Sequence, residues 1–123
     1  MNVFVYQAAL LCEECGLAER ERLSPWGLTP PAADSEDSDL WPQGLYPNGG
    51  GEADTPNHCD HCGLFLENPL TSDGEAYVAD LLIEHFANGR GNKEILLEWA
   101  EFYDIALTDL FDRKNAPTIG LPA

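Results

Sequence analysis

The sequence is poor in basic residues. Its 123 residues contain 6 Lys and Arg against 22 Asp and Glu, which leaves a formal net charge of −16 at pH 7. A protein that binds DNA or an anionic membrane by ordinary electrostatics needs a positive surface to neutralise phosphates. The shortage of cations therefore argues against direct nucleic-acid binding and against binding to an anionic membrane.

Long apolar runs are also missing. The longest fall far short of the roughly 20 residues that span a bilayer, so we expect no transmembrane segment. Residues 1–11 are apolar but have no basic flank and no small-residue cleavage site, so we expect no secretory signal. These absences predict a cytoplasmic protein. The length and the 44% hydrophobic content fit one domain with a packed core, residues 1–123.

Residues 24–57 differ in composition from the rest of the chain. They hold six of the nine prolines and five of the eleven glycines, but no Lys or Arg. This composition predicts a long loop with a self-repelling acidic run at residues 34–39. A disordered segment would seldom carry large apolar side chains, so we expect parts of the loop to lie against the core. These side chains are Trp26, Trp41, Leu45 and Tyr46.

Short elements are predicted on both sides of this loop. Residues 3–6 are β-branched and aromatic, which favours a strand that leads toward Cys12, with a helix over 8–11 as the competing prediction. Residues 17–23 have the composition of a helix of about two turns. Residues 64–66 are expected to form a short strand or an apolar turn.

The C-terminal part has the periodicity of two helices. Apolar residues recur at helical spacing up to residue 87, after an N-cap at Ser72 or Asp73, and Gly89 follows as a stop. A second apolar stripe begins after Asn92. We expect a helical hairpin over 72–112, in which residues 105–111 form a bent continuation or a short helix, and a tail over 113–123.

All four cysteines occur in two C-x-x-C-G units, Cys12–Cys15 before Gly16 and Cys59–Cys62 before Gly63. Such a turn brings both sulfurs to one side of a tight loop with backbone amides directed at them, and the glycine accepts the conformation that the turn requires. Two such knuckles complete a tetrahedral thiolate site. Four soft ligands favour a structural Zn²⁺ ion, with iron as the less favoured alternative.

Other uses of the cysteines fit less well. Disulfide bonds are disfavoured because thiols stay reduced in the cytosol. A thioredoxin-type redox site is disfavoured because the motif is duplicated and no βαβ pattern accompanies it. His58 or His61 could replace one cysteine as a ligand, although four thiolates already fill a tetrahedron. We expect bound metal to order the N-terminal strand, so that the metal-free protein is strongly destabilised.

These elements together predict an α+β fold. A small zinc-ribbon-like knuckle unit comprises residues 1–23 and 58–71, residues 24–57 are inserted into it as a long loop, and the unit is packed on the helical hairpin of residues 72–112.

The sequence predicts a protein that is not an enzyme. A catalytic zinc site keeps an open coordination position, and four cysteines leave none. The H-x-E pattern of zinc deaminases is missing, and residues 89–92 lack the lysine of a phosphate-binding loop. A metal-dependent enzyme with an unrecognised site stays open as an alternative.

The negative charge is concentrated in the middle of the chain. Residues 23–89 contain twelve carboxylates and no Lys or Arg. Four thiolates and one divalent ion would add −4 and +2, which changes the formal charge from −16 to −18. The two interpretations are a solvated acidic surface and a binding surface for a basic protein, whose association would weaken as salt rises. The candidate contacts, chosen for charge density alone, are Asp34, Glu36, Asp37, Asp39, Glu94, Glu98 and Glu101.

Residues 12–16 (CEECG), 47–54 (PNGGGEAD) and 59–71 (CDHCGLFLENPLT) together resemble short double C-x-x-C zinc-knuckle proteins of bacteriophages and prophages. The resemblance covers roughly the first two-thirds of the chain. It implies a phage accessory protein that acts in the host cytoplasm, and it carries over the four cysteines as metal ligands.

The resemblance supplies no activity. By analogy, a small acidic phage protein inhibits a host nucleic-acid-handling defence complex, as an anti-CRISPR or anti-restriction protein that mimics nucleic acid. The alternative is a zinc-knuckle adapter that binds its partner through the apolar residues of the 24–57 loop.

Overall fold

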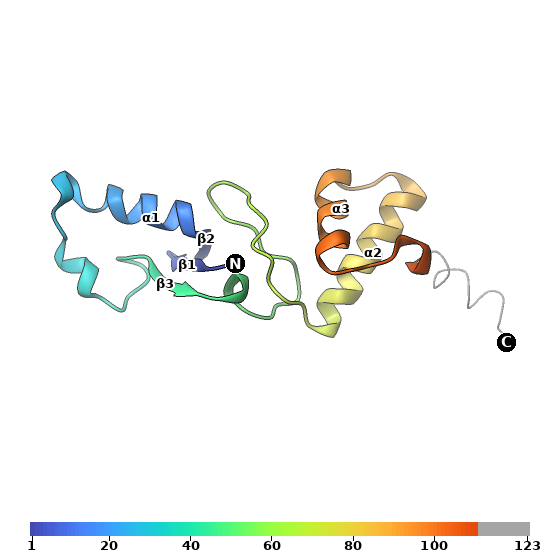
Figure 1. Ribbon diagram of the computed structural model, residues 1–123, viewed down its shortest axis with the longest axis horizontal. Helices are drawn as coiled ribbons and strands as arrows, with labels where there is room; N and C mark the ends of the chain where they lie inside the picture. The colour runs from blue at the N-terminus through green and yellow to red at the C-terminus, as the bar shows by residue number, and fades with distance from the viewer. Residues whose placement is uncertain (111–123) are drawn as a thin grey trace. The chain divides into compact units, whose positions relative to one another are not determined.

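A β-hairpin at the N-terminus is the centre of the first half of the molecule (Figure 1). In the computed structural model, which describes residues 1–110, strand β1 (Val3–Tyr6) pairs antiparallel with β2 (Ala9–Cys12). Gln7 and Ala8 turn the chain with φ angles of 51° and 61°. The strand predicted over residues 3–6 is confirmed, and the competing helix over 8–11 is wrong.

The predicted 24–57 loop contributes a strand to the same sheet. Strand β3 (Gln43–Tyr46) pairs antiparallel with the free edge of β1, so the strand order is β2-β1-β3. Three short 3₁₀ turns lie around it: η1 (Pro25–Gly27), η2 (Pro31–Asp34) and η3 (Asn48–Gly50). Treating the whole region as loop was therefore wrong. A four-residue edge strand between prolines is too short to show an alternating pattern in the sequence.

Helix α1 (Glu13–Arg22) follows β2 directly and covers β1. It begins four residues before the predicted helix, because the Cys12 sulfur caps it and the first turn carries two glutamates. Gly16 allows the close approach, since a Cβ there would lie 2.0 Å from a ring carbon of Phe4. The Arg20 guanidinium lies over the rings of Phe4 and Trp41, 4.6 and 5.5 Å from their centroids.

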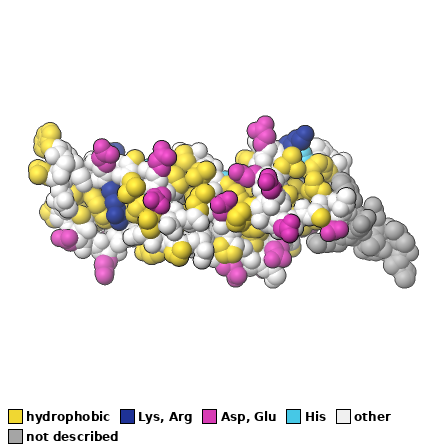
Figure 2. Space-filling model, viewed as in Figure 1, with side chains coloured by type: hydrophobic (Ala, Val, Ile, Leu, Met, Phe, Trp, Pro, Cys, Tyr) yellow, Lys and Arg dark blue, Asp and Glu magenta, His cyan; other side chains and the backbone are white. Residues whose placement is uncertain are grey.

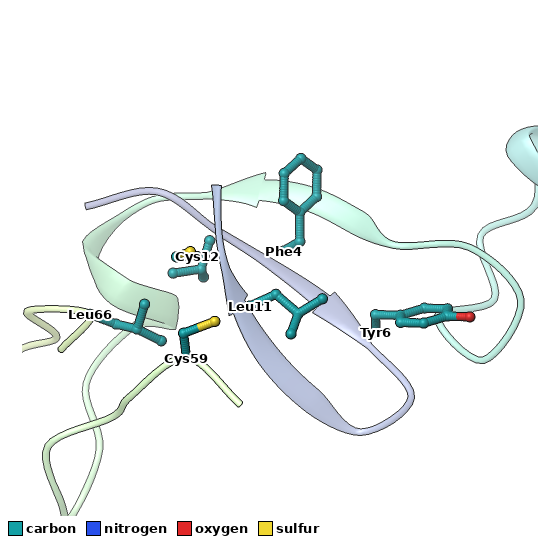
Figure 3. Packing of buried hydrophobic residues seen from close by; sticks show 7 residues of the cluster. Phe4, Tyr6, Leu11, Cys12, Cys59 and Leu66 are labelled. Carbon is teal, nitrogen blue, oxygen red and sulfur yellow. The ribbon is translucent and has the colours of Figure 1, made fainter. Parts of the chain in front are cut away.

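The core of this half combines strand residues with two of the cysteines (Figure 3). It is small, and every member is at most 7% exposed. Leu66 and Cys59 come from the segment after the 24–57 region, so this segment closes the core against the hairpin. The members are Val3, Phe4, Tyr6, Leu11, Cys12, Cys59 and Leu66.

The C-terminal part is the predicted helical hairpin, made of α2 (Ser72–Asn88) and α3 (Lys93–Phe102), which pack on each other (Figure 1). The N-cap of α2 is Thr71, one residue before the predicted position, and its hydroxyl accepts the Gly74 N–H at 3.0 Å. Gly89 ends the helix in the left-handed conformation, as predicted. A helical turn over residues 107–110 follows α3, and the predicted tail over 113–123 lies outside the described residues.

The chain divides into two compact units, residues 1–69 and residues from 70 onward. The sequence led us to expect one domain, and the boundary falls two residues before the expected start of the hairpin. The overall class is mixed, with a small three-stranded sheet and helices. The expected packing of the knuckle unit on the hairpin stays a prediction. Among residues 1–110, none of the helices combines the length and the hydropathy that a bilayer-spanning segment requires.

Candidate metal centre

The four cysteines meet in the first unit. Their Sγ atoms all lie within 4.8 Å of one another, and the Sγ atoms of Cys12 and Cys62 are 3.7 Å apart. All four are free thiols, since a disulfide would need a separation of about 2.05 Å. Cys12 and Cys59 are buried, Cys15 is half-buried and Cys62 is exposed. The fold thus brings together the four predicted metal ligands.

The first pair lies at the junction of a strand and a helix. Cys12 is the last residue of β2 and the N-cap of α1, and Cys15 lies in the first helical turn. The Cys15 N–H donates to the Cys12 sulfur at 3.4 Å. The predicted amide directed at a sulfur is present, but it belongs to the N-terminus of α1, whose dipole favours a thiolate. Gly16 is helical there, so its expected role as a turn residue is wrong.

The second pair forms the predicted knuckle. The Cys59 N–H donates to the Leu64 carbonyl at 2.8 Å, and the Gly63 N–H donates to the Cys59 carbonyl at 2.9 Å. Gly63 has a φ of 79°, so its role as a turn residue is confirmed. The Asp60 N–H donates to the Leu10 carbonyl at 2.9 Å, which joins the knuckle to β2 next to the first pair.

A buried asparagine supports the chain that leads into this knuckle. Asn68 is 0% exposed; its Oδ1 accepts the Asn57 N–H at 2.7 Å, and its Nδ2 donates to the carbonyls of Thr55 and Pro69 at 3.0 and 3.2 Å. The sequence did not indicate this role, because asparagine before proline is an ordinary turn signal. The contacts fix the segment two residues before Cys59.

The environment affects the thiols in different ways. Burial raises the pKa of Cys12 and of Cys15, and the neighbouring thiols add to that increase at Cys15. Burial also acts to raise the pKa of Cys59, but backbone N–H groups of Cys12, Cys62 and His61 outweigh it and lower the pKa to about 6. Four thiols within 4.8 Å of one another cannot all ionise without a cation, whereas a bound metal ion would stabilise them as thiolates.

The geometry fits a four-sulfur metal site. Metal–sulfur bonds of about 2.3 Å in a tetrahedron place the sulfurs about 3.8 Å apart, close to the 3.7 Å between Cys12 and Cys62. The largest separation of 4.8 Å requires only a small contraction. The group contains neither His58 nor His61, and the His58 ring packs on Phe65 with centroids 5.4 Å apart. These residues can hold a metal ion through four cysteines.

Four of the predicted partner contacts lie in one hydrogen-bonded segment of the first unit. Asp34, Glu36, Asp37 and Asp39 are all exposed. Their backbone is held locally, because the Asp39 N–H donates to Asp37 Oδ1 and the Gln7 N–H donates to the Ser38 carbonyl, both at 2.9 Å. The segment is therefore attached to the turn of the β-hairpin with its carboxylates facing solvent.

The other three predicted contacts lie on α3 of the second unit. Glu94, Glu98 and Glu101 are exposed, opposite the buried Leu96 and Trp99. The two acidic groups therefore belong to different units. Figure 2 shows carboxylates spread over the visible face with few Lys or Arg side chains among them.

No family model, curated protein or solved structure matches the chain. The description of the site therefore depends on its own residues.

Proposed function

We propose that this chain is a zinc-stabilised, non-enzymatic protein whose acidic surface binds a basic protein partner. The observation that supports the metal role is the convergence of four cysteine sulfurs from two distant C-x-x-C units within 4.8 Å. The proposed partner role is supported by the distribution of charge in the same unit.

Zinc is the proposed ion because four thiolates in a closed tetrahedron suit it as a structural metal. Such a site contributes folding free energy and leaves no coordination position for a substrate. Elemental analysis of the purified chain tests the identity of the bound metal, and we expect one zinc ion per chain. Iron at the same stoichiometry would contradict zinc, and no bound metal would contradict both.

Negative charge predominates in the first unit. Residues 1–69 contain twelve Asp and Glu but only Arg20 and Arg22, a formal charge of −10. Arg20 donates to the Pro42 carbonyl at 2.8 Å and covers two aromatic rings, and Arg22 donates to Glu19 at 2.6 Å. Both cations are thus used within the unit. The exposed carboxylates of residues 34–39 have no cation of this unit left to neutralise them, which favours electrostatically steered association with a basic surface.

The basic surfaces that such a charge would fit best are those built to hold nucleic acid. With the resemblance to phage proteins, this supports a host nucleic-acid-handling complex, including a defence complex, as the partner in the host cytoplasm. Inhibition would follow from occupation of the nucleic-acid site by carboxylates in place of phosphates.

The experiment compares two charge-matched variants of the zinc-loaded chain. Asp34→Asn with Glu36→Gln removes two carboxylates from the acidic segment, whereas Glu14→Gln with Glu21→Gln removes two exposed carboxylates from α1. Immobilised proteins are exposed to host extract over a salt series. We expect the first variant alone to lose a basic protein that wild type retains at low salt. No basic protein on wild type, or equal loss from both variants, would contradict the proposal.

One observation favours an adapter as the second candidate function. Trp26 is 93% exposed on the η1 turn, with a φ of 55°, so it presents its whole ring to solvent. Trp41 is 8% exposed and packs under Arg20, so it belongs to the core and cannot serve as a contact. An adapter would lose its partner on Trp26→Ala and keep it after neutralisation of the acidic segment.

A further inference from the structure

The second unit contains a cavity of about 450 Å³ that neither the metal centre nor the acidic segment uses. It lies between the first two turns of α2 and the chain that follows α3. Its volume is within the range of about 300–1,000 Å³ that is typical of small-ligand sites. All of its lining residues lie in the second unit, within residues 70–110.

The lining separates into an apolar floor and an acidic rim. Ala79 and Leu110 are buried at 6% and 3% exposure and form part of the floor. Glu75, Asp104 and Asp109 line the cavity with exposed side chains, and none of its described lining residues is basic. An occupant must therefore combine an apolar portion with a positive charge.

The cations described in this unit lie at the opposite end of the hairpin. Arg90 and Lys93 are in or next to the connection between α2 and α3, whereas Glu75 is in the first turn of α2. The thirteen helical steps from Glu75 to Asn88 correspond to about 20 Å. That distance exceeds the Debye length of about 8–10 Å at ordinary salt, so these cations do not neutralise the rim. The Arg90 Nε atom moreover lies 3.5 Å from Glu84 Oε1, so Arg90 already forms an ion pair with Glu84.

Two further features at the cavity favour a cation. The C-terminal end of α3, where the helix dipole is negative, is at Tyr103, and Tyr103 lines the cavity. Its aromatic ring can also face a cation. A metal ion would not use the apolar floor, whereas the long side chain of Arg or Lys places its methylene groups on such a floor and its charge at the rim.

We propose that this cavity receives an arginine or lysine side chain of a protein partner. The inference depends on the proposed function in that the basic partner supplies this side chain. Arginine is the better fit, because its planar guanidinium can donate to several carboxylates at once and can stack on a tyrosine ring.

The test uses the full zinc-loaded chain and a defined probe, the capped peptide Gly-Arg-Gly, with Gly-Lys-Gly as a second probe and Gly-Gln-Gly as the uncharged control. Amide NMR shifts report binding. We expect saturable shifts at residues 75–79 and 103–110 with a Kd on the order of 1 mM that rises with salt. The glutamine peptide is expected to give none.

Two charge-matched variants locate the binding. Asp104→Asn with Asp109→Asn removes the rim charges and is expected to weaken the Kd about ten-fold. Asn tolerates the φ of 55° at position 104, so the backbone should be kept. Glu14→Gln with Glu21→Gln removes two exposed charges from α1 of the first unit and is expected to leave the Kd unchanged. Equal weakening in both variants would mean non-specific attraction and would overturn the proposal.

A third variant examines the chain's own basic residues. Arg113→Gln with Lys114→Gln removes two cations close to Leu110 in the sequence. If the peptide binds only in this variant, the chain itself fills the cavity and a partner side chain is not the occupant. If the peptide binds in neither wild type nor this variant, the site is wrong. Retention of a basic protein through residues 34–39 would then still support the proposed function, so the two failures are distinguishable.

Discussion

The two units of this chain bury their apolar residues in different ways. The first uses three four-residue strands, one helix and long connections, and two of the seven residues in its buried core cluster are cysteines. The second uses a 17-residue and a 10-residue helix with a continuous apolar stripe. A unit with so little regular structure gains little from local hydrogen bonds, so cross-links between distant segments matter more for its stability. The helical unit can rely on packing between neighbours in sequence.

Removal of the metal should give the largest difference in stability between the two units. A strong chelator, or Cys59→Ser with Cys62→Ser, is expected to unfold residues 1–69, since a structural zinc site can contribute on the order of 10 kcal/mol. Residues 70–110 should keep their helices. Amide NMR spectra check this, with re-addition of Zn²⁺ as the reversal and Mg²⁺ as the control. Persistence of the signals of the first unit without metal would disprove the structural role.

A substitution that creates a cavity in the core of the helical hairpin should instead destabilise the second unit and leave the first unchanged. Leu82 is 0% exposed on α2, so Leu82→Ala is expected to destabilise the second unit by about 2–5 kcal/mol. Zinc content and the spectrum of the first unit should not change. Tyr77→Ala, at a side chain that is 43% exposed, serves as the mild control on the same helix. Loss of zinc in the Leu82 variant would mean that the units do not fold independently.

Asn68 tests how the first unit supports its knuckle. Asn68→Ala leaves the Asn57 N–H and the Thr55 carbonyl without their partner and is expected to cost about 1–3 kcal/mol. Asn68→Asp keeps the acceptor but places a carboxylate oxygen against the carbonyls of Thr55 and Pro69 at a buried position, so it should cost at least as much as alanine. Denaturant unfolding measures stability, and competition with a chromophoric chelator measures zinc affinity. The exposed Asn88→Ala is the control; equal effects at positions 68 and 88 would contradict this role.

The smallest expected effect is a pH dependence at Glu19. The hydrogen bond from Arg22 lowers the pKa of Glu19 below its ordinary value of 4.5, against the opposing effect of burial. A lowered pKa in the folded state stabilises the protein above pH 4.5, and this contribution disappears as pH falls through the folded-state pKa. Arg22 is 65% exposed, so solvent screening keeps this contribution small.

Comparison of wild type with Glu19→Gln over the pH range 3–7 isolates this contribution, because protonation of the cysteines affects both proteins alike. The stability difference should be constant near neutral pH and shrink in acid. A difference that grows as pH falls would contradict the assignment.

Sequence patterns predicted the second unit better than the first. The apolar spacing around Val78, Leu82, Leu96 and Trp99 repeats over several turns, and Gly89 is a strong stop signal, so both helices were found with small errors at their ends. In the first unit, β3 and the first four residues of α1 were missed. These elements depend on partners far along the chain, such as β1 for the strand and the Phe4 ring for Gly16.

By itself the sequence determined the candidate metal ligands, the excess of negative charge and the helical hairpin, because spacing, composition and periodicity are local properties of the chain. Only the tertiary structure decided that Cys12 caps a helix, that Trp41 is buried while Trp26 is exposed, and that Asn68 supports the knuckle. The acidic cavity of the second unit is likewise lined by α2 and by the chain after α3, which are separated by more than twenty residues. Contacts between distant residues form only when the core closes, and no local pattern encodes them.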